Sequence, residues 1–330
     1  MNNLVFIKLG GSLITDKQQR YHARQATIER LAEEMARARA ADPSLKLLVG
    51  HGSGSFGHVA ARESGYNPRK GHPSPMAFAR VAAAASALNQ LVRAALLDAG
   101  IPTISMPPSA SGRLQDGKLL EMAHQPICDL LAQGIVPLVF GDVALHADGK
   151  GGGIASTEMV FRLLAETLHP PRMLLLGIVE GVFAQAPPPP RGIADCGLRI
   201  AEPKKSEAAL PAEVQNPKSE ASLPLEIRNP RLRFLRKSEI RNPKSEIPPS
   251  PPLLREITPH NWQQVRAGLG GSHGTDVTGG MIAKVAESLA LIQAVPALQV
   301  RIVSGEQPGL LERLLLDPTL EAGTLIHKGA

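Results

Sequence analysis

Residues 45–58 read Leu-Lys-Leu-Leu-Val-Gly-His-Gly-Ser-Gly-Ser-Phe-Gly-His, a short apolar run that enters a turn rich in glycine and serine. The run Leu45–Val49 is typical of a buried strand. Glycines in the turn let backbone N–H groups approach a ligand closely, and consecutive N–H groups of this kind form an anion-binding nest. Ser53 and His58 add side-chain donors. The stretch alone is compatible with a plain strand-to-helix turn and with a phosphate site.

A second turn of the same kind lies near the N-terminus. Residues 3–9 predict a first buried strand, which carries Lys8 and enters Gly10-Gly11-Ser12. Lys17 follows in the run Ile14-Thr15-Asp16-Lys17. Ligands of α/β folds bind beyond the carboxyl ends of the strands, where both turns fall. The second turn therefore favours a phosphate site over a plain connection.

Strands alternate with helices along most of the chain, which predicts an α/β fold around a largely parallel sheet. Besides the two strands above, we expect strands at 101–106, 135–140, 172–178, 300–305 and 323–326, and half of a small hairpin at 117–121. Helices are expected at 26–40, 75–99, 127–133, 157–168, 276–294 and 310–316.

The first of these helices has a clear apolar face. Ile28, Leu31, Ala32 and Met35 recur at helical spacing, so they should face the core. By the same spacing Glu29, Glu33 and Glu34 should face water, with Thr27 as the N-cap.

Composition narrows the class of protein. The chain has 330 residues, of which 43% are hydrophobic and only 3% aromatic, so its core must be aliphatic. Two cysteines give no disulfide framework, and no apolar stretch approaches the length of a membrane span. A cytoplasmic protein without a membrane partner is expected. The net charge of +6 does not indicate a nucleic-acid partner, because residues 187–255 hold 13 Lys/Arg against 8 Asp/Glu and so account for most of it.

Residues 187–252 break the α/β pattern. The segment opens with four prolines and repeats Asn-Pro-Lys-Ser-Glu at 216–220 and 242–246. Such a composition cannot bury a core, so we interpret the segment as a disordered or loosely packed insertion. A docking segment is the rival interpretation.

Four pieces of the chain share one chemical property, since each offers N–H donors or a fixed cation. They are Lys8 with its glycine turn, Lys17, the 52–58 turn, and Thr278-Gly279-Gly280 with Lys284. Phosphoryl transfer needs mainly positioning and neutralisation of charge on the transferred group. No Gly-x-x-x-x-Gly-Lys-Ser/Thr run is present, so a P-loop enzyme is not indicated.

These motifs resemble those of the isopentenyl phosphate kinases, a family of the amino acid kinase superfamily. The resemblance rests on Lys8–Ser12, Ile14–Lys17, His51–His58, Gly141-Asp142-Val143 and Asp276–Met281, and it covers nearly the whole chain outside the insertion. It implies a three-layer αβα sandwich and a kinase that uses ATP and Mg²⁺ to convert isopentenyl phosphate to isopentenyl diphosphate in isoprenoid biosynthesis. It also implies a homodimer, an acceptor lobe at 1–172 and a nucleotide lobe at 173–330.

The resemblance also assigns roles to individual residues. Lys8 and Lys17 would hold the transferred phosphate, and His58 would donate to the acceptor rather than act as a base. The acceptor phosphate would lie on Gly52, Ser53, Gly54, His58 and Gly153. The nucleotide would lie on Lys8, Gly10, Gly11, Ser12, Gly177, Glu180, Thr278, Gly279 and Lys284. No metal ligand is assigned, and Asp142 and Asp148 could serve Mg²⁺ or a turn.

Two departures from the family pattern fall on the nucleotide side. Ala155-Ser156-Thr157-Glu158 stands where the family commonly has Ser-Gly-Asp-Asp, and residues 176–182 stand where it has Gly-Thr-Asp-Val-Asp-Gly-Val. Glu158 and Glu180 keep one carboxylate in each motif. Two alternatives therefore stay open: a kinase of another small phosphate or phosphonate, and a binding protein of the same fold with weakened catalysis.

Overall fold

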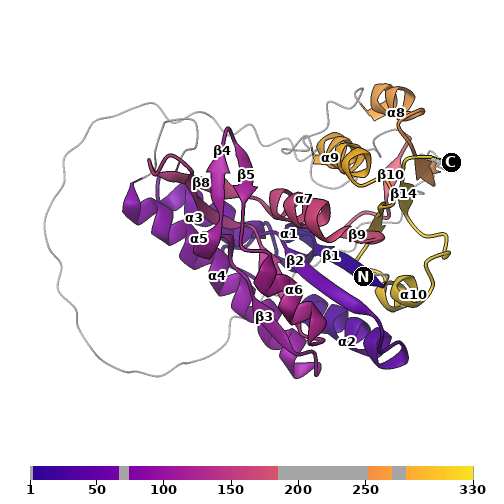
Figure 1. Ribbon diagram of the computed structural model, residues 1–330, viewed down its shortest axis with the longest axis horizontal. Helices are drawn as coiled ribbons and strands as arrows, with labels where there is room; N and C mark the ends of the chain where they lie inside the picture. The colour runs from indigo at the N-terminus through magenta and orange to yellow at the C-terminus, as the bar shows by residue number, and fades with distance from the viewer. Residues whose placement is uncertain (1–2, 67–73, 185–251, 270–279, 330) are drawn as a thin grey trace, which may run out of the picture. The chain divides into compact units, whose positions relative to one another are not determined.

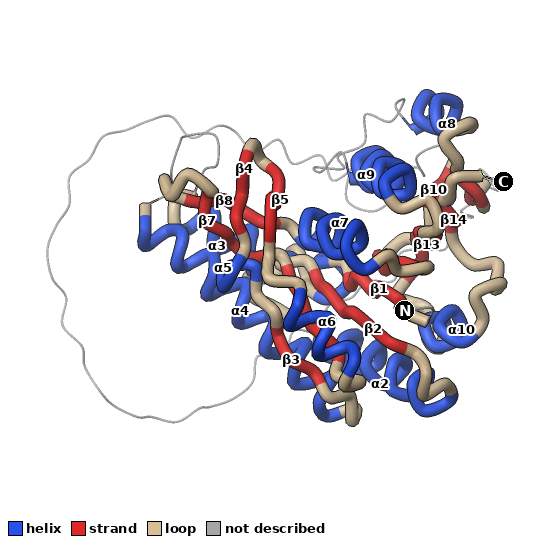
Figure 2. The backbone as a smooth tube through the Cα atoms, in the orientation of Figure 1, coloured by secondary structure: helices blue, strands red, loops and turns tan. Residues whose placement is uncertain are grey.

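A computed structural model describes residues 3–66, 74–184, 252–269 and 280–329. Nearly all of the predicted insertion lies outside these ranges, and so do Thr278 and Gly279. Within these ranges eight strands form the main sheet in the order β12-β14-β13-β9-β1-β2-β6-β3. Figure 2 draws the strands in red and labels β14, β13, β1, β2 and β3 of this sheet. Neighbouring strands are parallel except β13 and β14, so the predicted largely parallel sheet is confirmed. The strands are β1 (Leu4–Leu9), β2 (Lys46–His51), β3 (Thr103–Ser105), β6 (Val136–Phe140), β9 (Arg172–Gly177), β12 (Glu256–Ile257), β13 (Gln299–Ser304) and β14 (Thr324–Ile326).

The central strand β1 explains the three layers, because its alternate side chains enter two different cores. Val5, Ile7 and Leu9 pack with residues of α2 (Gln25–Ala41), α4 (Pro75–Asp98) and α10 (Leu310–Leu316). Leu4 and Phe6 pack with residues of α6 (Gln125–Ala132), α7 (Thr157–Leu168) and α9 (Gly280–Ala294). A strand that is apolar on both faces needs a helical layer on each side. The predicted αβα sandwich is confirmed (Figure 1).

Two smaller sheets accompany the main one in the described part of the chain. The first has the order β5-β4-β7-β8 and consists of β4 (Arg113–Gln115), β5 (Lys118–Glu121), β7 (Asp142–His146) and β8 (Gly152–Ala155). Its antiparallel β4–β5 pair is the predicted small hairpin. The second pairs β10 (Val182–Phe183) with β11 (Leu253–Leu254). The remaining helices are α1 (Gly11–Ile14), α3 (Gly54–Glu63), α5 (Pro108–Ser111) and α8 (Trp262–Leu269).

Helix α2 corrects two predictions. Its apolar face is buried as expected, but the N-cap is Arg24 rather than Thr27. Glu34 is wholly buried instead of facing water. Its carboxylate accepts hydrogen bonds from Arg30, at 2.6 Å, and from the backbone N–H of Leu311, at 3.0 Å. A contact 277 residues away in sequence, which the helical spacing does not encode, satisfies this carboxylate.

No helix in the described ranges is long and apolar enough to cross a membrane. The proposed boundary at residue 172 falls where β9 begins, within the main sheet, and the division into an acceptor and a nucleotide lobe stays a prediction.

Candidate active site

The two glycine turns follow neighbouring strands. Strands β1 and β2 are parallel, with Leu9 opposite His51, so both chains leave the sheet at the same edge. Gly10 leads into α1, and the second turn leads into α3, which begins at Gly54. The carboxyl edge of the sheet therefore brings together two of the four pieces that the sequence singled out.

The turns are in direct backbone contact. A Cβ added to Gly11 would lie 2.7 Å from the Cα atom of Gly54, so neither position has room for a side chain. Gly54 also has φ of +50°, which favours glycine. Thr15 joins the two turns, because its hydroxyl donates to Gly11 O at 2.7 Å and accepts from the Ser55 N–H at 3.0 Å.

Several N–H groups at this contact are available to a ligand. Among the described residues, the N–H groups of Gly11, Ser53 and Gly54 donate to no protein acceptor. Those of Ser53 and Gly54 stand at the N-terminus of α3, where the helix dipole adds positive potential. This arrangement is suited to an anion.

Lys8 supplies a fixed cation beside the turns. It is 8% exposed on β1, and its ammonium forms an ion pair with Glu158 in the first turn of α7. Ser156 caps the N-terminus of that helix, and its hydroxyl accepts from the Met159 N–H. Burial alone would raise the pKa of Glu158, but Lys8 and, less strongly, Lys284 outweigh it, so the pKa of this carboxyl is lowered.

A cavity of about 830 Å³ opens beside this ion pair. Lys8, Gly10, Gly177 and Lys284, four of the predicted nucleotide residues, are among its lining. Glu287 lines it too, and its pKa is raised by burial and by the charge of Glu158. The walls come from β9, α7, α9 and the β4–β5 hairpin, so the space is large enough for an organic ligand that carries charged groups.

The structure places the other predicted residues less centrally. Lys17 is exposed in the loop after α1, and His58 is exposed on α3. Glu180 is exposed and is absent from the cavity lining among the described residues, whereas nearby Gly177 belongs to it. Gly153 lies on β8 opposite Ala144. Ser12 follows Gly11 in α1.

The loop that carries Lys17 is attached to the helix that carries His58. Tyr21 packs the edge of its ring on Phe56, with centroids 5.6 Å apart, and its hydroxyl donates to Glu63 at 2.9 Å. Arg20 forms an ion pair with Glu63 as well. Lys17 and His58 therefore belong to two segments that are held together at both ends of α3.

No sequence pattern assigned a role to Thr15 or to the Lys8–Glu158 pair. Thr15 belongs to the quoted run Ile14–Lys17, but its role follows only from the packing of α1 on α3. Glu158 was noted as a retained carboxylate, and its contact with Lys8 depends on how α7 crosses β1. The β4–β5 hairpin residues that line the cavity had no motif to identify them.

The two candidate acids have structural roles in the described part of the chain. Asp142 is 4% exposed, accepts from the Ser109 N–H at 3.2 Å, and has a pKa raised by burial. Asp148 accepts from the Lys150 N–H at 2.9 Å within a turn. No group of three or more His, Cys, Asp or Glu that could hold a metal occurs among these residues.

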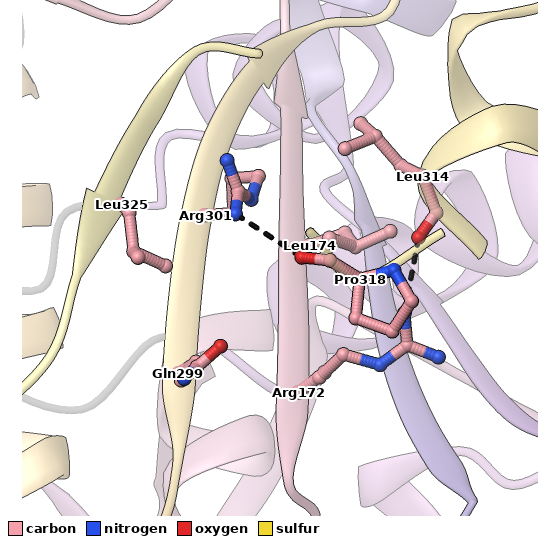
Figure 3. A pocket seen from close by; sticks show the side chains of 7 residues that line it. All are labelled: Arg172, Leu174, Gln299, Arg301, Leu314, Pro318 and Leu325. Carbon is pink, nitrogen blue, oxygen red and sulfur yellow. Dashed lines mark hydrogen bonds between the residues drawn. The ribbon is translucent and has the colours of Figure 1, made fainter. Parts of the chain in front are cut away.

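A second cavity, of about 10 Å³, lies at the opposite edge of the sheet (Figure 3). Arg172 opens β9 there and donates to the carbonyls of Leu314 and Leu315, at the end of α10. Arg301 donates to Ala322 O at 3.0 Å. Since backbone carbonyls engage both guanidinium groups and the cavity is too small for more than a water, this is a structural contact.

Comparison with known proteins adds to this geometry. Residues 3–192 match the amino acid kinase family. Isopentenyl phosphate kinase of Methanothermobacter thermautotrophicus is 34% identical over 191 residues, which are 56% of this chain and 70% of the relative. The Thermoplasma acidophilum enzyme of that name is 30% identical over 184 residues, 56% and 71% of the two chains.

Solved structures agree in fold. One of isopentenyl phosphate kinase superposes with a TM-score of 0.64 at 26% identity and covers 98% of this chain and 100% of that one. One of N-acetylglutamate synthase from Neisseria gonorrhoeae reaches 0.58 at 14% identity, covers 99% of this chain and 60% of its own, and shows likeness of fold alone.

Proposed function

The chain belongs to the amino acid kinase family, and from this premise we propose that it transfers the γ-phosphate of ATP to isopentenyl phosphate, which yields isopentenyl diphosphate. One observation carries the proposal. Two glycine turns on neighbouring parallel strands are interlocked, with unpaired N–H groups and Lys8 beside them. Such a site can hold two phosphate groups against each other, which is the main requirement of phosphoryl transfer.

The acceptor phosphate is proposed to bind the second turn. Ser53 and Gly54 offer N–H groups at the N-terminus of α3, and His58 would add a donor one helical turn further along. Gly52 and Gly153 are proposed to complete the set. An apolar cluster of Ala60, Tyr66, Val81 and Val143, with Ala60 on the same helix, supports an apolar chain on this phosphate. The preference for isopentenyl phosphate over a polar monophosphate is proposed from the relatives of that name.

The nucleotide is proposed to bind the first turn and the large cavity. Lys8, Gly10, Gly177 and Lys284 line that cavity, and Gly11 and Ser12 begin α1 beside it. Glu180, Thr278 and Gly279 complete the proposed nucleotide set. ATP is the phosphate donor of this family, and the cavity has the size for it.

The reaction needs little acid–base chemistry. An oxygen of the acceptor phosphate is already anionic near neutral pH, so it can attack the γ-phosphorus while the bridging oxygen leaves with ADP. Lys8 and Lys17 would neutralise the charge that spreads over the transferred group. His58 would donate a hydrogen bond to the acceptor.

Mg²⁺ fits this site as a companion of the nucleotide. The ion usually takes one or two carboxylates and fills its remaining positions with phosphate oxygens and water. Glu158 and Glu287 line the cavity and would be the carboxylates that hold it. When bound, it would neutralise the charge of the phosphates.

A homodimer is proposed as well. Strand β3 ends the sheet order, its Ile104 is 45% exposed, and Leu97 of the neighbouring α4 is 48% exposed. Apolar side chains at a sheet edge are suited to a second copy of the chain. Molar mass by light scattering would test this proposal, and a monomer would contradict it. A cytoplasmic location, which suits ATP-dependent chemistry, stays a prediction.

An ADP-release assay with isopentenyl phosphate, ATP and Mg²⁺ tests the proposed function. Turnover that depends on this acceptor, and falls strongly with a polar monophosphate of similar size, is the expected result. Turnover with the polar compound alone would indicate a different acceptor. Binding of isopentenyl phosphate without turnover would indicate a binding protein with weakened catalysis. The loss of catalysis would then be assigned to the changes at 155–158 and 176–182.

His58 and Lys17 give matched tests of the two roles. His58→Ala should lower kcat/KM strongly, and His58→Gln should retain part of it, because a neutral donor replaces some of the bonding to phosphate. Lys17→Met should lower kcat more than it raises the acceptor KM, because the cation acts on charge in the transition state. Unchanged kinetics in His58→Ala would remove His58 from the site, and unchanged kinetics in Lys17→Met would remove Lys17.

A further inference from the structure

His51 is the last residue of β2 and precedes the acceptor turn. Its side chain is wholly buried and stacks on Phe140 of the next strand, with centroids 5.5 Å apart and planes inclined by 5°. A buried imidazole loses its hydration and must recover it in hydrogen bonds. The proposed reaction assigns it no role, so its bonds call for a separate explanation.

Both ring nitrogens of His51 have polar partners. Nδ1 lies 3.2 Å from the carbonyl oxygen of Gly52, and Nε2 lies 3.2 Å from the side-chain oxygen Oδ1 of Asn89 on α4. A carbonyl oxygen only accepts, so Nδ1 must carry the proton. Burial lowers the pKa of His51 to about 4, and the groups around the ring, Asn89, Phe140 and the Gly52 carbonyl, are uncharged. The ring is therefore neutral, and Nε2 accepts.

This tautomer fixes the orientation of the Asn89 amide. The Asn89 oxygen lies toward Nε2 of His51, and its nitrogen lies 2.7 Å from Ser105 Oγ. A neutral ring with its proton on Nδ1 requires the reverse orientation of the amide, in which the NH₂ group donates to Nε2 and the oxygen accepts from the Ser105 hydroxyl. The oxygen and nitrogen of an amide are interchangeable in shape, so this assignment follows from the hydrogen bonds. A chain of donors then runs from the Ser105 hydroxyl through Asn89 and His51 to the Gly52 carbonyl.

The Gly52 carbonyl is the point where this chain reaches the acceptor turn. Because a peptide unit is planar and trans, holding that carbonyl toward the His51 ring turns the Ser53 N–H in the opposite direction. The backbone on the other side is fixed too, since Gly52 N–H donates to Leu9 O at 3.1 Å and His51 O accepts from the Thr157 hydroxyl at 2.7 Å. The bond from His51 is therefore the contact that sets the direction of the Gly52 carbonyl within a turn whose preceding backbone is already fixed.

We propose that His51 is a positioning residue of the acceptor site, whose neutral Nδ1–H tautomer holds the Gly52 carbonyl so that the Ser53 and Gly54 N–H groups face the acceptor phosphate. The inference rests on the proposed function for the identity of that phosphate. It assigns to the buried Asn89 and the half-buried Ser105 the role of fixing the tautomer.

The tautomer can be observed directly in the wild-type protein. Long-range ¹H–¹⁵N correlation spectra resolve the two ring nitrogens, and the His51 signals are those missing from a His51→Asn variant. A protonated Nδ1 and an unprotonated Nε2 between pH 6 and 8 are expected. An imidazolium, or a proton on Nε2 with Nδ1 bare, would overturn the proposal.

Kinetics then separate positioning from general packing. His51→Phe keeps an aromatic ring on Phe140 but has no donor for the Gly52 carbonyl, and it should raise the KM for isopentenyl phosphate about tenfold or more with the KM for ATP nearly unchanged. His51→Asn places an amide nitrogen near the position of Nδ1 and should recover part of the loss. An equal rise of both KM values, or no recovery, would overturn the proposal.

The outcomes stay distinguishable if the proposed function fails. A wild-type protein that releases no ADP would contradict the kinase, whereas the ring spectra and calorimetric binding of isopentenyl phosphate by the same variants would still decide the role of His51. The spectra need only the wild type and the conservative His51→Asn variant to fold. Equal affinity of wild type and His51→Phe for isopentenyl phosphate would overturn the positioning role.

Discussion

The two edges of the main sheet use cationic side chains in opposite ways. At the carboxyl edge, Lys8 lies beside interlocked glycine turns whose N–H groups have no protein acceptor among the described residues. At the amino edge, Arg172 and Arg301 donate to the backbone carbonyls that end α10 and precede β14. The carboxyl edge keeps backbone N–H donors for a ligand and pairs its cation with Glu158 at a cavity, whereas the amino edge uses its cations to hold the chain.

This difference shows that a buried cation is not by itself a sign of function. What distinguishes the edges is which groups remain unsatisfied, and donors whose partners are all protein carbonyls leave nothing for a substrate. It predicts that substitutions at the carboxyl edge change turnover and that substitutions at the amino edge change stability.

Lys8→Met should have the largest effect and should fall on turnover. We expect kcat to drop at least about 100-fold, because one electrostatic contact to the transferred charge is commonly worth that much. The free energy of unfolding should change by only about 1 kcal/mol, because the lost ion pair is partly exposed at Glu158. Steady-state kinetics and urea unfolding measure the two quantities.

Lys46→Met provides the matched control. Lys46 begins β2 at the amino edge, opposite Leu4 of β1, and should leave kcat unchanged. A similar loss of kcat in both variants would contradict the distinction between the edges.

Acidification should act on the carboxyl edge, because His51 titrates there while arginine stays protonated. The folded pKa of His51, about 4, lies below its unfolded value of 6.5, so the unfolded state binds the proton first. The contribution of His51 to stability is complete above pH 6.5 and is lost as the pH falls toward 4. It amounts to about 3 kcal/mol.

Unfolding of the wild type and of His51→Asn across this pH range isolates the contribution of His51 to the free energy of unfolding. All other titratable groups are the same in the two proteins. The wild type should lose about 3 kcal/mol more than the variant between pH 6.5 and 4. Parallel curves would show that His51 is accessible to protons in the folded state.

The sequence predicted the carboxyl edge better than the amino edge for a physical reason. Glycine turns after apolar runs are local signals, and parallel strands place such turns at one edge, so residues 10–12 and 52–54 could be brought together in advance. The burial of Glu34 and the carbonyl contacts of Arg172 depend on α10, far along the chain, and no local spacing carries that information.

The same limit separates the elements and site residues that the sequence predicted from those that it missed. Helices at 157–168 and 310–316 were predicted with their observed bounds, because their apolar spacing is regular. The short strands β7 and β8 and helix α8 were missed, since they lack a long periodic run. Within the site, the Lys8–Glu158 pair required knowledge of how α7 crosses β1, which only the assembled fold supplies.

Arg172→Met should weaken the amino edge without slowing the reaction. It removes hydrogen bonds of 3.0 and 3.2 Å to two carbonyls at the end of α10. Since the side chain is only partly buried, we expect the free energy of unfolding to fall by about 2 kcal/mol rather than by the full value of two charge-assisted bonds. Arg301→Met, whose second bond is 3.5 Å long, should cost less. Loss of kcat in folded Arg172→Met would contradict the assignment of this edge to stability.

The smallest effect is expected from replacing residues 190–250 by a short Gly/Ser linker, which tests whether either edge depends on that segment. The chain on its two sides already meets in the structure: Val182 pairs with Leu254, Phe183 pairs with Leu253, and the Ala184 N–H donates to Pro252 O at 2.9 Å. A short linker would therefore close an existing antiparallel pair. Because the cost of closing a loop grows only with the logarithm of its length, the deletion should raise the free energy of unfolding by about 1–2 kcal/mol at most. Turnover should stay unchanged, and limited proteolysis of the full-length chain should cut first between 190 and 250. A deletion variant that fails to fold, or folds with reduced kcat, would show that the segment supports the carboxyl edge from which β10 continues.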